Sequence, residues 1–159
     1  MYKNHAESKL RLERFETTAR EAGIKLTHQR LVIFQEIAAS DEHPDVEAVY
    51  QAVRKQLPTI SLDTVYRTLW TLNDLGLITT LSPRRENIRF DPNLKQHHHF
   101  VCTNCGSIRD FESESFNSLA VPMEVQKFGT VVSTSVELRG LCEKCSHKRQ
   151  HSVNKNKEK

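Results

Sequence analysis

Several features are scarce in this chain of 159 residues. No apolar run approaches the roughly 18 residues that a membrane span needs, and the first residues lack the apolar core of a signal peptide. Hydrophobic residues make up 37% of the chain, which is enough for modest cores but not for one large core. We therefore expect a soluble, cytoplasmic protein of one ordinary domain or two small ones, with its thiols kept reduced.

Cysteine is scarce too: there are four, arranged as Cys102–Cys105 and Cys142–Cys145 with 36 residues between the pairs. Two Cys-x-x-Cys turns offer four thiolates, a ligand shell that suits Zn²⁺. Two disulfides or a thioredoxin-like redox pair are the alternatives, although disulfide frameworks usually serve smaller, secreted chains. Because four protein thiolates leave no open position for a substrate, we interpret the site as structural. We expect it to tie a strand–helix–strand excursion back to its start.

Net charge is low, at +3, which argues weakly against nucleic-acid binding. The charge is uneven, however. Residues 148–159 are rich in Lys, Asn and His, and this composition predicts a disordered basic tail. All four cysteines follow residue 90, so the chain divides into a helical first part and a cysteine-bearing second part.

Helix signals dominate the first 76 residues. Side chains that can cap a helix N-terminus stand at Thr27 and Ser61, and Pro44-Asp45 is placed to open the third helix. Gly23 and Gly76 are placed to end helices. Apolar residues recur at intervals of three and four between these signals, which is the pattern of helices with one buried face. The sequence therefore predicts a bundle of four helices.

A hairpin is expected after the fourth helix. Leu77–Leu81 and Ile88–Phe90 have the composition of short strands, and residues 82–87 between them form a polar turn with a proline. Helices followed by a hairpin with a basic tip predict a winged helix-turn-helix domain over residues 1–90. Arg84 and Arg85, at the tip of the wing, would suit DNA phosphates.

The fourth helix has two faces. Its apolar arc, expected in the core, holds Leu62, Val65, Leu69 and Leu72. The opposite arc holds Asp63, Thr64, Arg67, Trp70 and Thr71, with Tyr66 at the boundary. A helix that enters the DNA major groove needs Arg, aromatic and short polar side chains on its outer face, and Arg can bind guanine through two hydrogen bonds. The alternative is an ordinary solvated face.

A set of histidines and aspartates lies near the first cysteine pair. His97 and His99 alternate, so on a strand both would point to one face. Asp91 precedes them, Asp110 follows, and His43 lies far away in the sequence. Such a mixed nitrogen and oxygen set suits Fe²⁺ or Mn²⁺, and a ligand from the first domain would let the metal lock that domain's orientation. A surface histidine tract is the alternative.

Together these motifs resemble the ferric uptake regulator (Fur) family over residues 10–147, and most of all its peroxide-sensing (PerR) branch. The motifs that carry the resemblance are Leu26–Arg30, His43–Pro44, Thr64–Leu69, Arg89–Asp91, His97–His99 and both cysteine pairs. The resemblance implies an α+β fold, with an N-terminal winged helix-turn-helix domain, a hinge at 91–96 and a C-terminal α/β dimerisation domain at 97–147. It also implies a homodimeric repressor, not an enzyme, that binds a pseudo-palindromic double-stranded DNA operator.

The resemblance implies roles for individual residues. One structural Zn²⁺ per subunit is expected on Cys102, Cys105, Cys142 and Cys145. One regulatory Fe²⁺ or Mn²⁺ per subunit is expected on His43, Asp91, His97, His99 and Asp110. DNA contacts are expected from Thr64, Tyr66, Arg67, Arg84 and Arg85.

The balance of ligands bears on what is sensed. Three histidines and two aspartates resemble the peroxide-sensing branch, in which Fe²⁺ and H₂O₂ oxidise a ligand histidine, corresponding here to His43 or His97. The alternative is an iron- or zinc-uptake regulator that senses metal reversibly. Because residues 131–136 contain no histidine, no complete third metal site is expected, and His98 has no assigned role. A metalloenzyme or a thiol oxidoreductase has little support, since no general base stands apart from the ligands.

Overall fold

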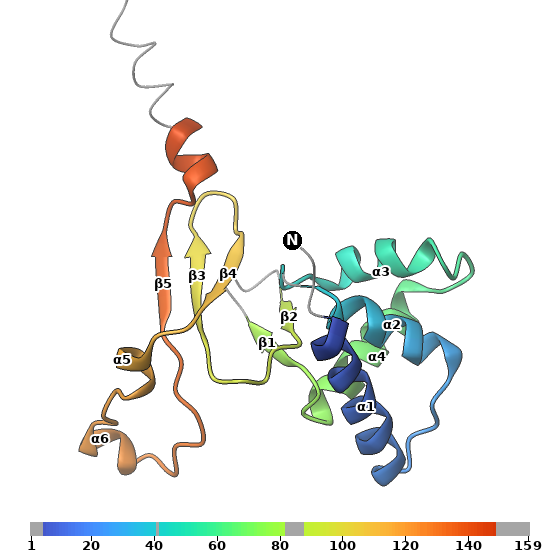
Figure 1. Cartoon of the computed structure of the whole chain (residues 1–159), viewed down its shortest axis with the longest axis horizontal. Helices are drawn as coiled ribbons and strands as arrows, with labels where there is room; N and C mark the ends of the chain where they lie inside the picture. The colour runs from blue at the N-terminus through green and yellow to red at the C-terminus, as the bar shows by residue number, and fades with distance from the viewer. Residues whose placement is uncertain (1–4, 41, 82–87, 149–159) are drawn as a thin grey trace, which may run out of the picture. The chain divides into compact units, whose positions relative to one another are not determined.

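The computed structural model describes residues 5–40, 42–81 and 88–148 of the chain. It divides into two compact units, residues 1–94 and residues 95–159 (Figure 1). The wing tip with Arg84 and Arg85, and the basic tail from residue 149 onward, lie outside the described residues. No helix among the described residues combines the length and the hydropathy that a membrane crossing requires.

The first unit contains four helices and a two-stranded sheet. Its elements are α1 (His5–Glu21), α2 (His28–Ala38), α3 (Val46–Arg54), α4 (Leu62–Asp74), β1 (Thr79–Leu81) and β2 (Arg89–Asp91). The predicted caps of α2 and α4 are confirmed: the side chains of Thr27 and Ser61 accept hydrogen bonds from backbone N–H groups in the first turns of these helices. The third helix starts where it was predicted, and Asp45 caps it in the same way. The strands β1 and β2 pair antiparallel, as the predicted hairpin requires.

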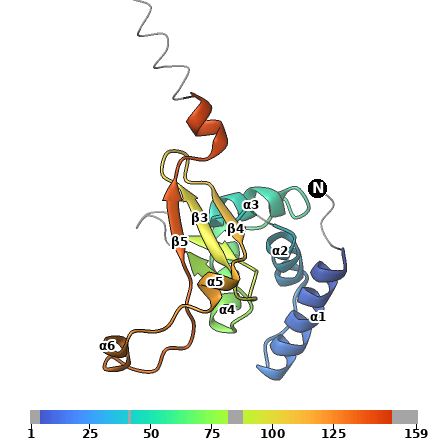
Figure 2. The same ribbon diagram turned by 60° about the vertical axis from the view of Figure 1, so that its left-hand side comes forward.

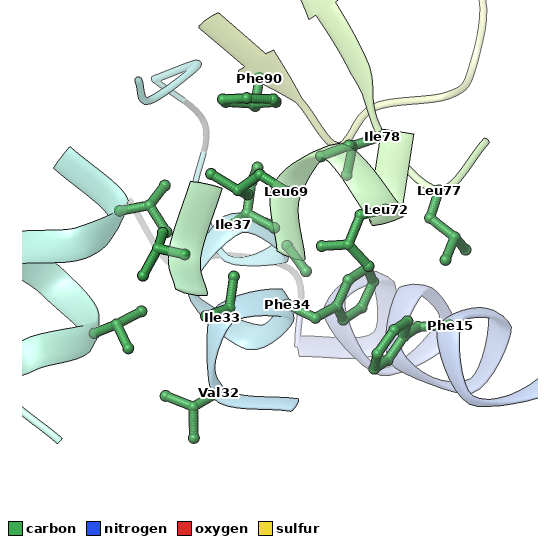
Figure 3. Close-up of a cluster of buried hydrophobic side chains, with 14 of the residues drawn as sticks. Phe15, Val32, Ile33, Phe34, Ile37, Leu69, Leu72, Leu77, Ile78 and Phe90 are labelled. Atoms are coloured by element: carbon green, nitrogen blue, oxygen red, sulfur yellow. The ribbon is translucent and has the colours of Figure 1, made fainter. Parts of the chain in front are cut away.

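A single hydrophobic core holds this unit together (Figure 3). The rings of Phe15 in α1 and Phe34 in α2 stack with their centroids 4.4 Å apart. Val65, Leu69 and Leu72 of α4 are buried in the same core, as the helical spacing predicted. Each fully buried apolar side chain of this size stabilises the fold by roughly 1.5–3 kcal/mol relative to an exposed one. The core therefore holds α4 by its inner face and leaves the outer face to solvent.

Two predictions about α4 were wrong. Leu62 was expected in the core but is 43% exposed, because it is the first residue of the helix and the buried arc begins one turn later. Trp70 was expected on the outer arc but is half-buried, because its ring packs edge-on against Phe90 of β2 with centroids 6.2 Å apart. The sheet thus covers a side of α4 that the helical periodicity alone assigned to solvent.

The second unit is a three-stranded sheet with the strand order β4-β3-β5. Its elements are β3 (His98–Cys102), β4 (Ile108–Phe111), the short helices α5 (Glu114–Asn117) and α6 (Met123–Gln126), and β5 (Glu137–Gly140). β3 pairs antiparallel with β4 and parallel with β5. The predicted excursion between the cysteine pairs is therefore a strand, two helical turns and a strand. Figure 2 shows α5 and α6 on a segment that extends beyond the end of the sheet.

Candidate functional site

The four cysteines form one cluster at the end of the second unit. Cys102 ends β3, and the parallel register between β3 and β5 places Gly140 beside it, two residues before Cys142. All four are free thiols whose sulfur atoms lie within 4.8 Å of one another. The Sγ atoms of Cys105 and Cys142 are 3.7 Å apart. Tetrahedral Zn–S bonds of about 2.3 Å place sulfurs roughly 3.8 Å apart, so this spacing fits a zinc site and not a disulfide.

Backbone hydrogen bonds already favour a thiolate in this cluster. The N–H groups of Cys105 and Cys142 lower the pKa of the Cys102 thiol to about 6. The Asn104 amide also lowers the pKa of Cys145, but the neighbouring thiols, Cys142 first, and burial outweigh it and raise that pKa to about 11. Neighbouring thiolates repel one another, so the ionisation of one thiol disfavours the ionisation of the next. The cluster is thus chemically suited to a divalent soft cation.

His43 and Asp91 form a buried pair in the first unit. The His43 Nε2 and Asp91 Oδ1 atoms are 3.6 Å apart, and both side chains are at most 2% exposed. The N–H of Phe90 donates a hydrogen bond to the carbonyl oxygen of Pro44 over 3.0 Å, which ties β2 to the loop that carries His43. His43 has a φ of +48°, in the left-handed region that costs a residue other than glycine free energy. The local fold therefore holds a strained histidine beside a buried carboxylate.

His97, His99 and Asp110 form a second cluster, inside the second unit. The Nε2 atoms of His97 and His99 are 2.8 Å apart, and the strand register places His99 opposite Asp110. The Asp110 Oδ1 atom lies 3.7 Å from the Nε2 of His97 and 3.5 Å from that of His99. The Nδ1 of His97 is 2.7 Å from the carbonyl oxygen of Lys95, which can only accept, so Nδ1 donates there and Nε2 is the nitrogen that faces His99 and Asp110. Two ring nitrogens and a carboxylate thus converge as metal ligands do.

The outer face of α4 carries polar and aromatic side chains. Tyr66 is 48% exposed, and the exposed Arg67 lies one turn from Asp63 on the same face. Thr64 is half-buried, and its hydroxyl lies 2.8 Å from that of the capping Ser61. Of the residues predicted to contact DNA, Tyr66 and Arg67 are therefore the accessible ones among the described residues, whereas Thr64 is partly engaged in the helix cap.

A model of the ferric uptake regulator family matches residues 21–139. The chain belongs to the ferric uptake regulator family. This confirms the resemblance and the fold class that the sequence predicted, and it makes the protein a metal-responsive regulator of transcription.

Several relatives share most of the length of the chain. The peroxide-responsive repressor PerR of Staphylococcus aureus strain Mu50 is 32% identical over 137 residues, which are 86% of this chain and 93% of that protein. Among solved structures, a zinc-bound manganese uptake regulator is 30% identical with a TM-score of 0.64, over 80% of this chain and 97% of that one. The ferric uptake regulator of Helicobacter pylori, described as having three functional metal-binding sites, has a TM-score of 0.70 over 87% of this chain and 93% of that one. At 23% identity it supports the fold alone.

His98 has a place in this Fur-family fold that the sequence reasoning did not find. It points to the opposite face of β3 from its two neighbours, as alternation predicts, and is fully buried. Its ring packs against Phe111 and Phe116, with centroids 5.4 and 5.5 Å away, and its Nδ1 accepts a hydrogen bond from the N–H of Val136. His98 therefore fixes the segment before β5. The aromatic residues at positions 111 and 116 were the available signal.

Proposed function

We propose that this Fur-family chain is a homodimeric repressor loaded with Fe²⁺ or Mn²⁺ and inactivated by peroxide. The regulatory metal is held by His43, Asp91, His97, His99 and Asp110, and a structural Zn²⁺ by the four cysteines. Residues 1–90 form the DNA-binding domain, 91–96 the hinge and 97–147 the dimerisation domain. The division of the chain after residue 94 supports a hinge in that segment.

The observation that carries the regulatory site is the pair of imidazole nitrogens on His97 and His99. Their Nε2 atoms lie 2.8 Å apart beside the Asp110 carboxylate, and the Lys95 carbonyl sets the tautomer of His97. The buried pair of His43 and Asp91 supplies the remaining nitrogen and oxygen ligands from the first unit. Three nitrogens and two carboxylates suit Fe²⁺ or Mn²⁺, and this ligand count leaves a coordination position open to a small oxidant.

Peroxide sensing follows from the same ligands. Fe²⁺ held by these residues would supply redox chemistry toward H₂O₂, giving one electron to the peroxide and regaining one from the oxidised ring, whereas Mn²⁺ would be inert. In the net reaction one oxygen atom of H₂O₂ would be inserted into an imidazole C–H bond of His43 or His97, giving C–OH, and the rest of the peroxide would leave as water. The oxidised ring is a weaker and bulkier ligand, so the metal is lost and DNA is released. The peroxide-responsive relatives, at 31–32% identity, support this branch.

A second copy of this chain accounts for the exposed apolar residues of the second unit. No residue from 109 to 144 is buried, although this segment carries large apolar side chains. Those exposed by 42% or more are Leu119, Met123, Phe128, Val132 and Leu138. A segment without buried residues cannot be held by its own core, and exposed apolar patches mark sites of association. Two DNA-binding domains related by a twofold axis would then read a pseudo-palindrome.

Reversible metal sensing is the competing function, and the zinc-bound manganese uptake regulator at 30% identity favours it. One experiment separates the two. The full-length protein is loaded anaerobically with Fe²⁺ or with Mn²⁺, and its operator is first selected from random duplex DNA. Sub-stoichiometric H₂O₂ is then added, and peptide masses and DNA binding are measured.

The gain of one oxygen atom on the His43 or His97 peptide, with Fe²⁺ only and with loss of DNA binding, is the expected result. Unchanged masses with DNA binding that is reversed by chelation would make the protein a reversible metal sensor. The Mn²⁺-loaded sample is the internal control, because it occupies the same ligands without reducing peroxide.

A further inference from the structure

Asp63 and Arg67 form an ion pair on the outer face of α4. The Arg67 Nε atom lies 3.0 Å from the Asp63 Oδ2 atom, one helical turn away, and the two side chains are 78% and 67% exposed. Exposed pairs at this spacing contribute little to the stability of a fold, because water screens the two charges. The ion pair therefore does little to hold the fold together, and its main effect is on the orientation of the two side chains.

A carboxylate is costly on a surface that approaches DNA. The phosphate backbone dominates affinity for DNA, and each negative charge on the protein face opposes it. Asp63 stands in the first turn of α4, the end of a recognition helix whose side chains contact base edges. An acidic residue in that place therefore needs a compensating contribution to binding or to specificity.

The geometry of the ion pair offers such a contribution. The guanidinium of Arg is a planar fork, and guanine is recognised through O6 and N7 by two parallel hydrogen bonds. The Asp63 carboxylate engages the Nε–H of Arg67, which leaves the terminal nitrogens Nη1 and Nη2 at the far end of the fork. Held in one orientation, Arg67 loses less side-chain entropy on binding than a freely rotating arginine does.

We propose that Asp63 is a positioning residue that orients Arg67 to read one guanine in each half of the operator. The inference rests on the proposed DNA-binding function and adds to it the base that is read and the residue that enforces the choice. Without Asp63, Arg67 would still be attracted to phosphates but would no longer favour guanine at that position.

A structural role for Asp63 is the competing explanation, and the chain contains a matched control. Glu47 occupies the corresponding first turn of α3, and its Oε1 accepts a hydrogen bond from the Nε2 of Gln51 over 2.7 Å. Glu47→Ala therefore removes an acidic group and an i,i+4 contact from a helix start, as Asp63→Ala does. Asp63→Asn keeps an oxygen that can accept from the Arg67 Nε–H.

The test selects sequences from random duplex DNA with full-length, Mn²⁺-loaded protein and compares the base preferences of the variants. The wild type, Glu47→Ala and Asp63→Asn should each prefer guanine at one position per half-site by about 10-fold or more, as a bidentate contact provides. Asp63→Ala and Arg67→Ala should lose that preference at the same position and keep the preferences elsewhere. Asp63→Ala should also bind unrelated DNA more tightly.

Retention of the guanine preference in Asp63→Ala would overturn the inference. Loss of the guanine preference in Glu47→Ala would also overturn it, because a general loss of helix stability would then explain the result for Asp63→Ala. If the wild type itself enriches no sequence, it is the DNA-binding function that fails, and the two failures are thereby distinguished.

Discussion

The Nε2 atoms of His97 and His99 face each other at 2.8 Å, with the carboxylate of Asp110 beside both. Two ring nitrogens at that separation require a proton between them or a shared cation. Since Nδ1 of His97 donates to the Lys95 carbonyl oxygen, its Nε2 is the nitrogen that faces His99 and Asp110. Both rings are at most 8% exposed. Among the described residues, this contact is the observation that most favours a regulatory metal.

Replacing His99 by Ala should lower the affinity for Mn²⁺ at least about 100-fold. Loss of a residue that only hydrogen-bonds to a metal ligand already lowers metal affinity by about 10–100-fold, and loss of a ligand itself should cost more. Zinc content should stay unchanged, since the cysteine cluster is made of other residues. Equilibrium dialysis with metal analysis measures both quantities. His147→Ala is the control, because it also removes a histidine beside a carboxylate but lies outside the proposed ligand set. The Nε2 of the exposed His147 is 3.9 Å from the Oε1 of Glu143. An unchanged affinity in His99→Ala would remove His99 from the ligand set.

Replacing Cys142 by Ser should release the zinc and unfold the second unit. Structural zinc binding contributes about 10–16 kcal/mol in small zinc-binding peptides, and few residues of the second unit are buried. Metal analysis and circular dichroism would show both losses. Ser146→Ala, one residue beyond the second pair, should keep the zinc. A folded, dimeric Cys142→Ser protein without zinc would contradict a structural role for the metal.

As pH is lowered, the affinity for zinc should fall more steeply below about pH 6 than above it. The folded pKa of Cys102 is depressed from 9.0 to about 6, so the stabilisation by its thiolate is present above pH 9.0 and is lost as pH falls through 6. Cys145 has the opposite sign: its pKa is raised to about 11, so its contribution is present below 9.0 and is lost as pH rises through 11.

Between about pH 6 and pH 9.0 the thiolate of Cys102 is already formed before zinc binds. As pH falls through about 6, binding should therefore displace about one more proton per zinc ion. Competition with a chelator, measured across this pH range, gives the number of protons displaced. If the number of protons displaced per zinc ion is the same above and below pH 6, Cys102 is not the cysteine that ionises first.

Replacing Phe128 by Asp should convert the proposed dimer into a monomer. Phe128 is 86% exposed, and a charge on an apolar association surface must be desolvated when the surface is covered. Light scattering during size-exclusion chromatography measures the mass. Leu10→Asp is the matched control, because Leu10 is also an exposed apolar residue but belongs to α1 of the first unit. Dissociation by both variants, or by neither, would argue against an interface at Phe128.

The starts of α2, α3 and α4 were predictable because they depend on local chemistry. A Thr, Asp or Ser side chain satisfies backbone N–H groups within three residues of itself, so Thr27, Asp45 and Ser61 mark helix starts without any distant contact. Alternation along a strand is equally local, and it placed His97 and His99 on one face and His98 on the other. Local patterns did not predict the environment of two positions that contact another element. Trp70 is covered by β2, and His98 is enclosed by Phe111 and Phe116.

The amino-acid sequence by itself determined the ligand types, the capped helices and the membership in the Fur family, because side-chain chemistry and spacing are written in it. The tertiary structure decided which distant groups meet. Parallel pairing of β3 with β5 brings Gly140 beside Cys102, and hence Cys142 within 3.7 Å of Cys105, although 36 residues separate them in the chain. Antiparallel pairing of β3 with β4 likewise places Asp110 opposite His99. The ladder hydrogen bonds that fix these pairings form only when the strands come together in the sheet, so the ligand geometry is a property of the assembled fold.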